Sequence, residues 1–263
     1  MVKLGGAASS AYLVAFPGIK EHFRRQGIAL DWVLYSDYDA LVDAFVNREI
    51  DIAWNGPLAY VKIKRRLDQP CQVIAMRDVD VGMVTHFITR SESAISKMEH
   101  LKGKRFAFGS RGSVETGVLA YHFMKEAGIN PRNDLSSCTF YEDRQPGTLS
   151  DERDVAERVL AGEYDAGAIC RTTPDTLAAE QALSPGALRI FWSSPGYSHC
   201  CFTAQGDMDP SLSEKIAQAF VSMDYADPVG KQVMDSEGCK AFVHGITEGW
   251  EALEKVAEEE GLI

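Results

Sequence analysis

No part of the 263-residue sequence contains the roughly 18 to 20 consecutive apolar residues that a membrane-spanning helix needs. The sequence also lacks an excess of basic residues, since its formal net charge is −11 and its pI is near 5.0. Nucleic acids and anionic membranes attract basic surfaces, so we expect neither as a partner. A small anionic ligand is not excluded, because a local site can oppose the charge of the whole chain.

The signature motifs of common enzyme classes are absent as well. There is no Walker loop, no GxGxxG, no GxSxG and no HExxH. The sequence therefore points to no reaction of its own and implies no cofactor.

The cysteines form no Cys-x-x-Cys pair, and a chain of this length does not need disulfides to fold. Most lie in apolar, strand-like surroundings, so we expect buried free thiols, which favour a reducing compartment. The six are Cys71, Cys138, Cys170, Cys200, Cys201 and Cys239.

The first residues do not resemble a signal peptide, because Met1-Val2-Lys3 precedes only Leu4 and a Gly-Gly pair. Two localisations follow from this pattern. The protein is cytoplasmic if Met1 is the native start, and periplasmic or extracytoplasmic if a leader was removed.

What the sequence does contain is a regular alternation of strand and helix patterns. Residues 2–53 read as strand, helix, strand, helix, strand, and residues 101–169 repeat this order. Strands separated by helices favour parallel pairing with right-handed crossovers. We therefore predict a two-lobed α/β fold, each lobe having a mixed, mostly parallel sheet flanked by helices.

The order of the segments also predicts the domains. The closing run of helices, near residues 211–259, has no strands of its own and should pack on the first lobe. We expect residues 1–83 and 200–263 in lobe 1 and residues 84–199 in lobe 2. Ligands of open α/β sheets bind at the carboxyl ends of strands, so a ligand cleft is expected between the lobes.

Four segments resemble one known family. They are similar to its "DIA-x-x-GP-x-AY", "LKGK-x-x-AF", "KAGI-x-P" and "V-x-x-G-x-x-DAGA" segments in family order, at residues 51–60, 101–110, 127–131 (the AGI-x-P part) and 159–168. The chain thus resembles the phosphonate/phosphate-type substrate-binding proteins of ABC transporters. The resemblance implies the type II periplasmic-binding-protein fold and a solute-binding protein that closes on a small polar, anionic ligand.

The resemblance also implies partners: a small-molecule ligand and an ABC permease. A phosphonate or phosphate ester is the first expectation for the ligand, followed by a sulfonate or a carboxylate. The sequence departs from the family pattern at two places that bear on this specificity. The anion loop, usually "P-x-STSG", reads SRGSVETG at residues 110–117, and Glu142-Asp143-Arg144 replaces a "GSH" segment after Tyr141.

The loop of residues 110–117 runs into a predicted helix, whose first amides and positive dipole end can cradle an anion. Ser110, Ser113 and Thr116 are the candidate contacts there, together with Tyr141. The alternative is that Ser113 is an ordinary helix cap.

Candidate contacts in the first lobe follow the ends of its strands. Asn55 ends one strand, Tyr60 follows in the next helix, and Arg77 could make a forked contact with an anion. A surface pair between Arg77 and Asp80 is the alternative. The full set of predicted ligand contacts is Ser9, Tyr35, Tyr38, Asn55, Tyr60, Arg77, Ser110, Ser113, Thr116, Tyr141 and His199.

The segment His199-Cys200-Cys201 offers donors that zinc, copper or iron prefers. Three interpretations stay open: a metal site of His199, Cys200 and Cys201, a catalytic pair of His199 and Cys200, or packed thiols beside a hydrogen-bonded histidine. On a strand, His199 and Cys201 should share a face. The alternatives to a binding protein are accordingly a cytoplasmic enzyme that uses His199 and Cys200 with a metal or thiolate, and a ligand sensor.

Overall fold

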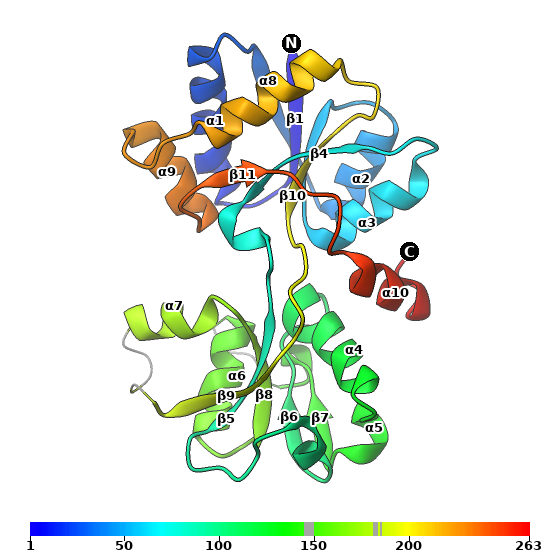
Figure 1. Ribbon diagram of the computed structural model, residues 1–263, viewed down its shortest axis with the longest axis vertical. Coiled ribbons are helices and arrows are strands. Elements are labelled where there is room, and N and C mark those ends of the chain that lie inside the picture. The colour runs from blue at the N-terminus through cyan, green and yellow to red at the C-terminus, as the bar shows by residue number, and fades with distance from the viewer. Residues whose placement is uncertain (145–149, 181–183, 185) are drawn as a thin grey trace. The chain divides into compact units, whose positions relative to one another are not determined.

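The computed structural model describes residues 1–144, 150–180, 184 and 186–263 (Figure 1). The chain divides into two compact units. Unit 1 comprises Met1–Gly82 and Tyr197–Ile263, and unit 2 comprises Met83–Gly196. The sequence had placed these boundaries after residues 83 and 199. Within the described residues, no helix has the length and apolar character that a bilayer crossing needs.

Unit 1 is built around a mixed sheet with strand order β11-β4-β10-β3-β1-β2. Strands β1 to β4 run in one direction, while β10 and β11 oppose them. The sheet is mixed, as the sequence predicts, but it is mostly parallel only by strand direction: the pairings of β1 with β2 and β3 are parallel, and the other three are antiparallel. The strands are β1 Val2–Ala7, β2 Leu30–Tyr35, β3 Ile52–Asn55, β4 Gln72–Arg77, β10 Cys201–Ala204 and β11 Phe242–His244.

Helices cover both faces of this sheet (Figure 1). Alternate residues of one strand enter different cores: Ile52 and Trp54 pack with α1, α8 and α9, while Ala53 packs with α2 and α3. A short 3₁₀ turn, Asp78–Asp80, follows β4. The helices are α1 Tyr12–Arg25, α2 Tyr38–Val46, α3 Pro57–Arg66, α8 Pro210–Val221, α9 Pro228–Glu237 and α10 Glu251–Glu259.

Unit 2 has a second mixed sheet, with strand order β7-β6-β8-β5-β9. Only β5 opposes the direction of the other strands, since it pairs antiparallel with both β8 and β9. The strands are β5 Thr85–Arg90, β6 Arg105–Ala107, β7 Ser137–Thr139, β8 Ala166–Cys170 and β9 Leu188–Ser193.

Two cores also flank this sheet. Phe106 and Phe108 pack with α4, and Ala107 packs with α6 and α7. A π-helical turn, Val114–Val118, leads directly into α4. The helices are α4 Leu119–Glu126, α5 Pro131–Asp134, α6 Asp151–Leu160 and α7 Thr173–Ala179, and further 3₁₀ turns lie at Met98–Leu101 and Tyr141–Asp143.

Two local expectations are wrong. The closing helices are not without a strand, because β11 lies between α9 and α10 and pairs antiparallel with β4. Within the strand-helix repeat of residues 101–169, the apolar pattern also predicts a strand over Thr139–Tyr141, but the strand is Ser137–Thr139, since its partners on β6 are Arg105 to Ala107. Tyr141 then begins a 3₁₀ turn.

Candidate functional site

Most predicted contacts of unit 1 lie near one edge of its sheet. Ser9 follows β1, Tyr35 ends β2, Asn55 ends β3 and Arg77 ends β4. Because β1 to β4 run in the same direction, their carboxyl ends share an edge. Strand β10 runs the opposite way, so His199, two residues before it, lies at this edge too.

The Arg77 guanidinium is held by the protein itself. Nε donates to Asp80 Oδ2 (2.6 Å), Nη2 to Asp80 Oδ1 (2.8 Å) and Nη1 to the Glu237 carbonyl (2.6 Å). It also lies over the Trp54 ring, 5.2 Å from the centroid. The Asp80 side chain is fully buried, so this pair is an internal one and not a surface pair. A direct contact between Arg77 and a ligand remains a prediction.

Two further residues of this region were missed by sequence reasoning. Burial raises the pKa of Glu237 to about 7, although Arg77 opposes the shift. Glu237 Oε1 has no hydrogen-bond partner among the described residues. Tyr12, which a hydrogen bond links to Tyr38, has its pKa raised chiefly by burial. The position of Tyr12 just after β1 was the available signal, whereas nothing local marked Glu237.

His199 and Cys200 meet Asp80. His199 Nδ1 lies 3.0 Å from Asp80 Oδ1 and 3.2 Å from Cys200 Sγ. Among the residues that the structure describes, these form one group of potential metal ligands, and Cys201 lies outside it. The sequence predicted that His199 would share a face with Cys201, but its side chain lies against Cys200 instead. His199 and Cys200 both precede the first residue of β10, so the alternation of strand residues does not apply to them.

This arrangement does not favour the catalytic interpretation of His199 and Cys200. In a nucleophilic triad the acid and the nucleophile use different ring nitrogens of the histidine. Here Asp80 and Cys200 both approach Nδ1. The imidazole cannot be held by Asp80 through one nitrogen while it deprotonates Cys200 through the other.

Other predicted contacts of unit 1 are largely internal. Asn55 is buried and its amide donates to the Ala53 carbonyl (3.2 Å) and to Thr203, while its Oδ1 has no partner within the described chain. Tyr60 packs on Trp250 with ring centroids 4.4 Å apart, and burial raises its pKa. Tyr35 is half-buried, with its pKa raised by burial and by Glu49.

Some contacts are closer to solvent. Tyr38 is 40% exposed. Its ring lies against Gly56, where an added Cβ would approach the ring to 3.1 Å. Ser9 is half-buried, and its hydroxyl accepts the Ala11 amide (3.3 Å).

In unit 2, carboxylates of the chain occupy the predicted anion loop. The Ser110 amide donates to Asp151 Oδ2 (2.8 Å) and the Arg111 amide to Glu142 Oε1 (3.0 Å). The Arg111 guanidinium pairs with Asp143 (2.6 Å). These amides therefore bind oxyanions, but the oxyanions here are side chains of the same protein.

Ser113 caps the helical turn that follows the loop. Its hydroxyl accepts the Thr116 amide (3.1 Å) and the Thr116 hydroxyl (2.8 Å), and donates to Glu115 (3.1 Å). The backbone passes closely under these groups, since a Cβ on Gly109 would lie 1.9 Å from Thr116 Oγ1. Capping is the alternative role that the sequence allowed for Ser113, and it does not exclude a ligand contact.

Tyr141 and Arg144 follow β7. The Tyr141 amide donates to the Gly109 carbonyl (3.0 Å), which fixes Tyr141 beside the loop. Arg144 is buried and donates to Asp154 (2.7 Å), the Thr139 carbonyl (2.9 Å) and the Phe108 carbonyl (2.7 Å). Arg144, which lies where the sequence departs from the family pattern, thus connects three parts of unit 2 by hydrogen bonds.

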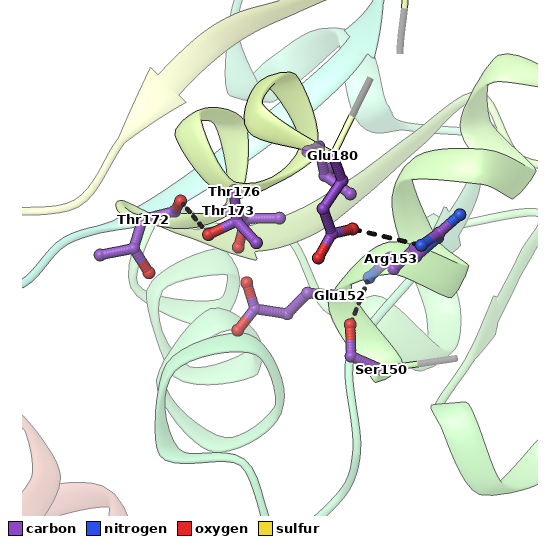
Figure 2. A pocket seen from close by; sticks show the side chains of 8 residues that line it. Ser150, Glu152, Arg153, Thr172, Thr173, Thr176 and Glu180 are labelled. Atoms are coloured by element: carbon purple, nitrogen blue, oxygen red, sulfur yellow. Dashed lines mark hydrogen bonds and ion pairs between the residues drawn. The ribbon is translucent and has the colours of Figure 1, made fainter. Parts of the chain in front are cut away.

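A hollow of about 350 Å³ opens where α6 and α7 begin (Figure 2). Burial raises the pKa of Glu152 to about 7, with Glu115 and Asp151 adding to the shift. Glu152 Oε2 accepts the Cys170 amide (3.0 Å), and its carboxyl extends in Figure 2 toward the side where Thr172 and Thr173 lie. The lining residues are Ser150, Glu152, Arg153, Thr172, Thr173, Thr176, Leu177 and Glu180.

Comparisons with known proteins identify relatives of this chain. It is 24% identical over 251 residues to the probable ABC transporter phosphite binding protein PhnD1 of Prochlorococcus marinus, covering 91% of this chain and 82% of that protein. It is also 24% identical over 212 residues to the phosphate-import protein PhnD of Mycolicibacterium smegmatis, covering 78% of this chain and 64% of that one.

Solved structures share the fold. The structure of the P. marinus PhnD1 in complex with methylphosphonate superposes with a TM-score of 0.70 at 21% identity, covering 100% of this chain and 98% of the other. The aliphatic sulphonate binding protein SsuA of Escherichia coli gives a TM-score of 0.61 at 14% identity, over 100% and 93%. These type II periplasmic binding proteins establish the predicted fold.

The family described as "ABC transporter, phosphonate, periplasmic substrate-binding protein" matches residues 19–248, most of the chain. That span includes strands, helices and candidate contacts of both units. The chain therefore belongs to the phosphonate family of ABC transporter periplasmic substrate-binding proteins.

Proposed function

We propose that this protein binds a small oxyanion of the phosphonate or phosphate-ester class and presents it to the permease of an ABC importer. The family match over residues 19–248 carries the proposal. Relatives are named for phosphite, phosphate and sulphonate, and PhnD1 was solved in complex with methylphosphonate; all four ligands are tetrahedral oxyanions. A sulfonate is the next choice for the ligand, and a carboxylate the last.

The proposed contacts lie in both units. In unit 2 they are Ser110, Ser113, Thr116 and Tyr141; in unit 1 they are Ser9, Tyr35, Tyr38, Asn55, Tyr60, Arg77 and His199. The amides of Ser110 and Arg111 support an oxyanion ligand, since they already donate to carboxylates. A ligand that uses them has to displace Asp151 or Glu142, which favours a ligand with more charge or more oxygens than one carboxylate.

Calorimetric titration with methylphosphonate, phosphite, phosphate, methanesulfonate and acetate tests the proposal. We expect one phosphorus oxyanion to bind with 1:1 stoichiometry and at least about tenfold more tightly than acetate, a difference of about 1.4 kcal/mol. If none of the five binds, or if acetate binds best, the proposed ligand class is wrong.

The variant Ser113→Ala locates the site. It should weaken the binding of the best oxyanion about tenfold or more, because a hydroxyl donor is lost from the loop. Asn130→Ala is the matched control, since Asn130 also caps a helix of unit 2, by accepting the Arg132 amide. Equal affinity in the wild type and Ser113→Ala would remove this loop from the site.

A further inference from the structure

Three different metal-binding side chains converge within unit 1. Asp80 ends the 3₁₀ turn after β4, and His199 and Cys200 lie just before β10, about 120 residues later. Asp80 Oδ1, His199 Nδ1 and Cys200 Sγ all lie within 4.8 Å of one another. We propose that Asp80, His199 and Cys200 form a site for one divalent metal ion of the zinc type.

The backbone fixes the two segments against each other. The His199 amide donates to the Asp80 carbonyl (3.0 Å), and the Cys200 amide donates to Asp80 Oδ1 (3.2 Å). The exposed fractions of the three residues are 0% for Asp80, 9% for His199 and 8% for Cys200. The three donor atoms are therefore held together, in surroundings that exclude most water.

Hydrogen bonding alone satisfies this cluster poorly. Nδ1 of His199 carries either one proton or one lone pair, yet it faces both Asp80 Oδ1 at 3.0 Å and Cys200 Sγ at 3.2 Å. With a proton, the ring nitrogen donates to Asp80, and Cys200 Sγ is left as a weak second acceptor. Without one, it can accept from the Cys200 thiol, but its lone pair then faces the lone pairs of the carboxylate. Either way one of the two contacts is poorly met. A cation accepts electron pairs from all three atoms and resolves the conflict.

The spacing also suits a metal. In a tetrahedral zinc site, bonds of about 2.0 to 2.3 Å place neighbouring ligand atoms about 3.3 to 3.6 Å apart. The observed separations of 3.0 and 3.2 Å are a few tenths of an ångström shorter. A small outward movement of the three side chains would admit the ion. Imidazole, thiolate and carboxylate together are a donor set that zinc accepts.

A charged partner supports the proposed ligands. Arg77 orients the Asp80 carboxylate through two hydrogen bonds, as partners of metal ligands commonly do. A divalent ion and Arg77 would carry three positive charges, and an Asp80 carboxylate with a Cys200 thiolate would offset two of them. The Glu237 carboxyl lies near Arg77, with one oxygen 3.8 Å from Nη1.

The site would be an open one. Three protein ligands leave the fourth position of a tetrahedral ion to water or to an oxygen of a small molecule. Binding also requires the Cys200 thiolate, so the thiol proton is released when the ion enters. Neither feature depends on the anion-binding proposal, which can fail while metal binding holds.

Cobalt titration of the chelator-treated full-length protein tests the inference. Co²⁺ takes zinc positions and gives a thiolate-to-metal absorption band in the near ultraviolet when a cysteine binds it. We expect this band to saturate at one equivalent, to disappear on addition of Zn²⁺, and to be absent from Cys200→Ser. The adjacent Cys201→Ser should keep it, because Cys201 lies outside the cluster.

Melting temperatures provide a second readout that does not rely on colour. Zn²⁺ at several times the protein concentration should raise the melting temperature of the wild type and of Cys201→Ser, but not of Cys200→Ser. If Cys201→Ser fails to fold, Cys170→Ser in unit 2 takes its place as the control. Absence of stoichiometric binding by the wild type, or a full cobalt band in Cys200→Ser, would overturn the assignment.

Discussion

Glu237, a buried carboxyl group beside a buried ion pair, gives unit 1 a pH response. Its pKa in the folded protein is about 7, against an ordinary value of 4.5, because burial disfavours the charged form. The folded state therefore keeps a proton between pH 4.5 and 7 that the unfolded state has lost. Stability consequently falls as pH rises through this window and levels off above it.

We predict that Glu237→Gln removes this part of the pH dependence. The shift corresponds to about 3 kcal/mol in the free energy of unfolding. Urea unfolding should show wild type and variant nearly equal at pH 5, and the variant more stable at pH 8. Glu152 in unit 2 has its pKa raised in the same direction, so some slope persists in the variant.

An exposed glutamate is the control for this effect. Glu214 lies on the solvent side of α8 in the same unit, and Glu214→Gln should leave the wild-type pH profile unchanged. If Glu237→Gln follows the wild-type profile at both pH values, Glu237 is ionised in the folded protein throughout, and the stated shift is wrong.

The sequence identified candidate binding residues at the ends of strands, but it did not predict which residues they contact. Arg77, at the end of a strand, and the donors His199 and Cys200 were recognised as candidates. Asp80 contacts His199 although 119 positions of sequence separate them. This contact depends on the pairing of β4 with β10, and no local sequence pattern encodes that pairing. The same limit applies to Glu237, whose link to Arg77 spans 160 positions.

At the scale of elements, one arginine ties several of them together in unit 2. Arg144 links the ends of β6 and β7 to α6 through Phe108, Thr139 and Asp154. It is 5% exposed, so loss of the guanidinium leaves two carbonyl groups and part of a carboxylate without their donor. Removing one partner of a buried pair costs about 3 to 5 kcal/mol.

We therefore predict a loss of about 3 to 5 kcal/mol of stability for Arg144→Met, measured from the urea midpoint and slope. Arg153→Met is the matched control on α6. Arg153 pairs with Glu157 and Glu180 at side-chain exposures of 34% to 48%, so its loss should cost less than about 1 kcal/mol. Equal costs for the two variants would contradict the structural role assigned to Arg144.

Elements with clear end signals were predictable from sequence. Asp37 caps α2 by accepting the Ala40 amide (2.8 Å), and Gly27 adopts the positive φ of 70° just beyond α1. Strand β11 has no such signal. It is three residues long, and only its pairing with β4 distinguishes Phe242–His244 from a loop between two helices.

For the whole molecule, the repeated order of strands and helices was sufficient to predict two sheets in one chain. The units are joined at Gly82–Met83 and at Gly196–Tyr197. That a ligand engages both of them is a separate prediction. A ligand changes a conformational equilibrium only by the difference in its affinity for the two states. A ligand that contacts both units must therefore restrain the motions of both units. A ligand that contacts a single unit restrains only that unit.

Hydrogen–deuterium exchange with the best-binding oxyanion tests this prediction. At about 100 times Kd, a ligand specific for the folded state stabilises it by about 2.7 kcal/mol. We expect slower amide exchange in residues 109–118 of unit 2 and in residues 77–80 of unit 1, with both protections weakened in Ser113→Ala at the same ligand concentration. Protection limited to one unit would show that the ligand is held by that unit alone, and the contacts proposed in the other would have to be abandoned.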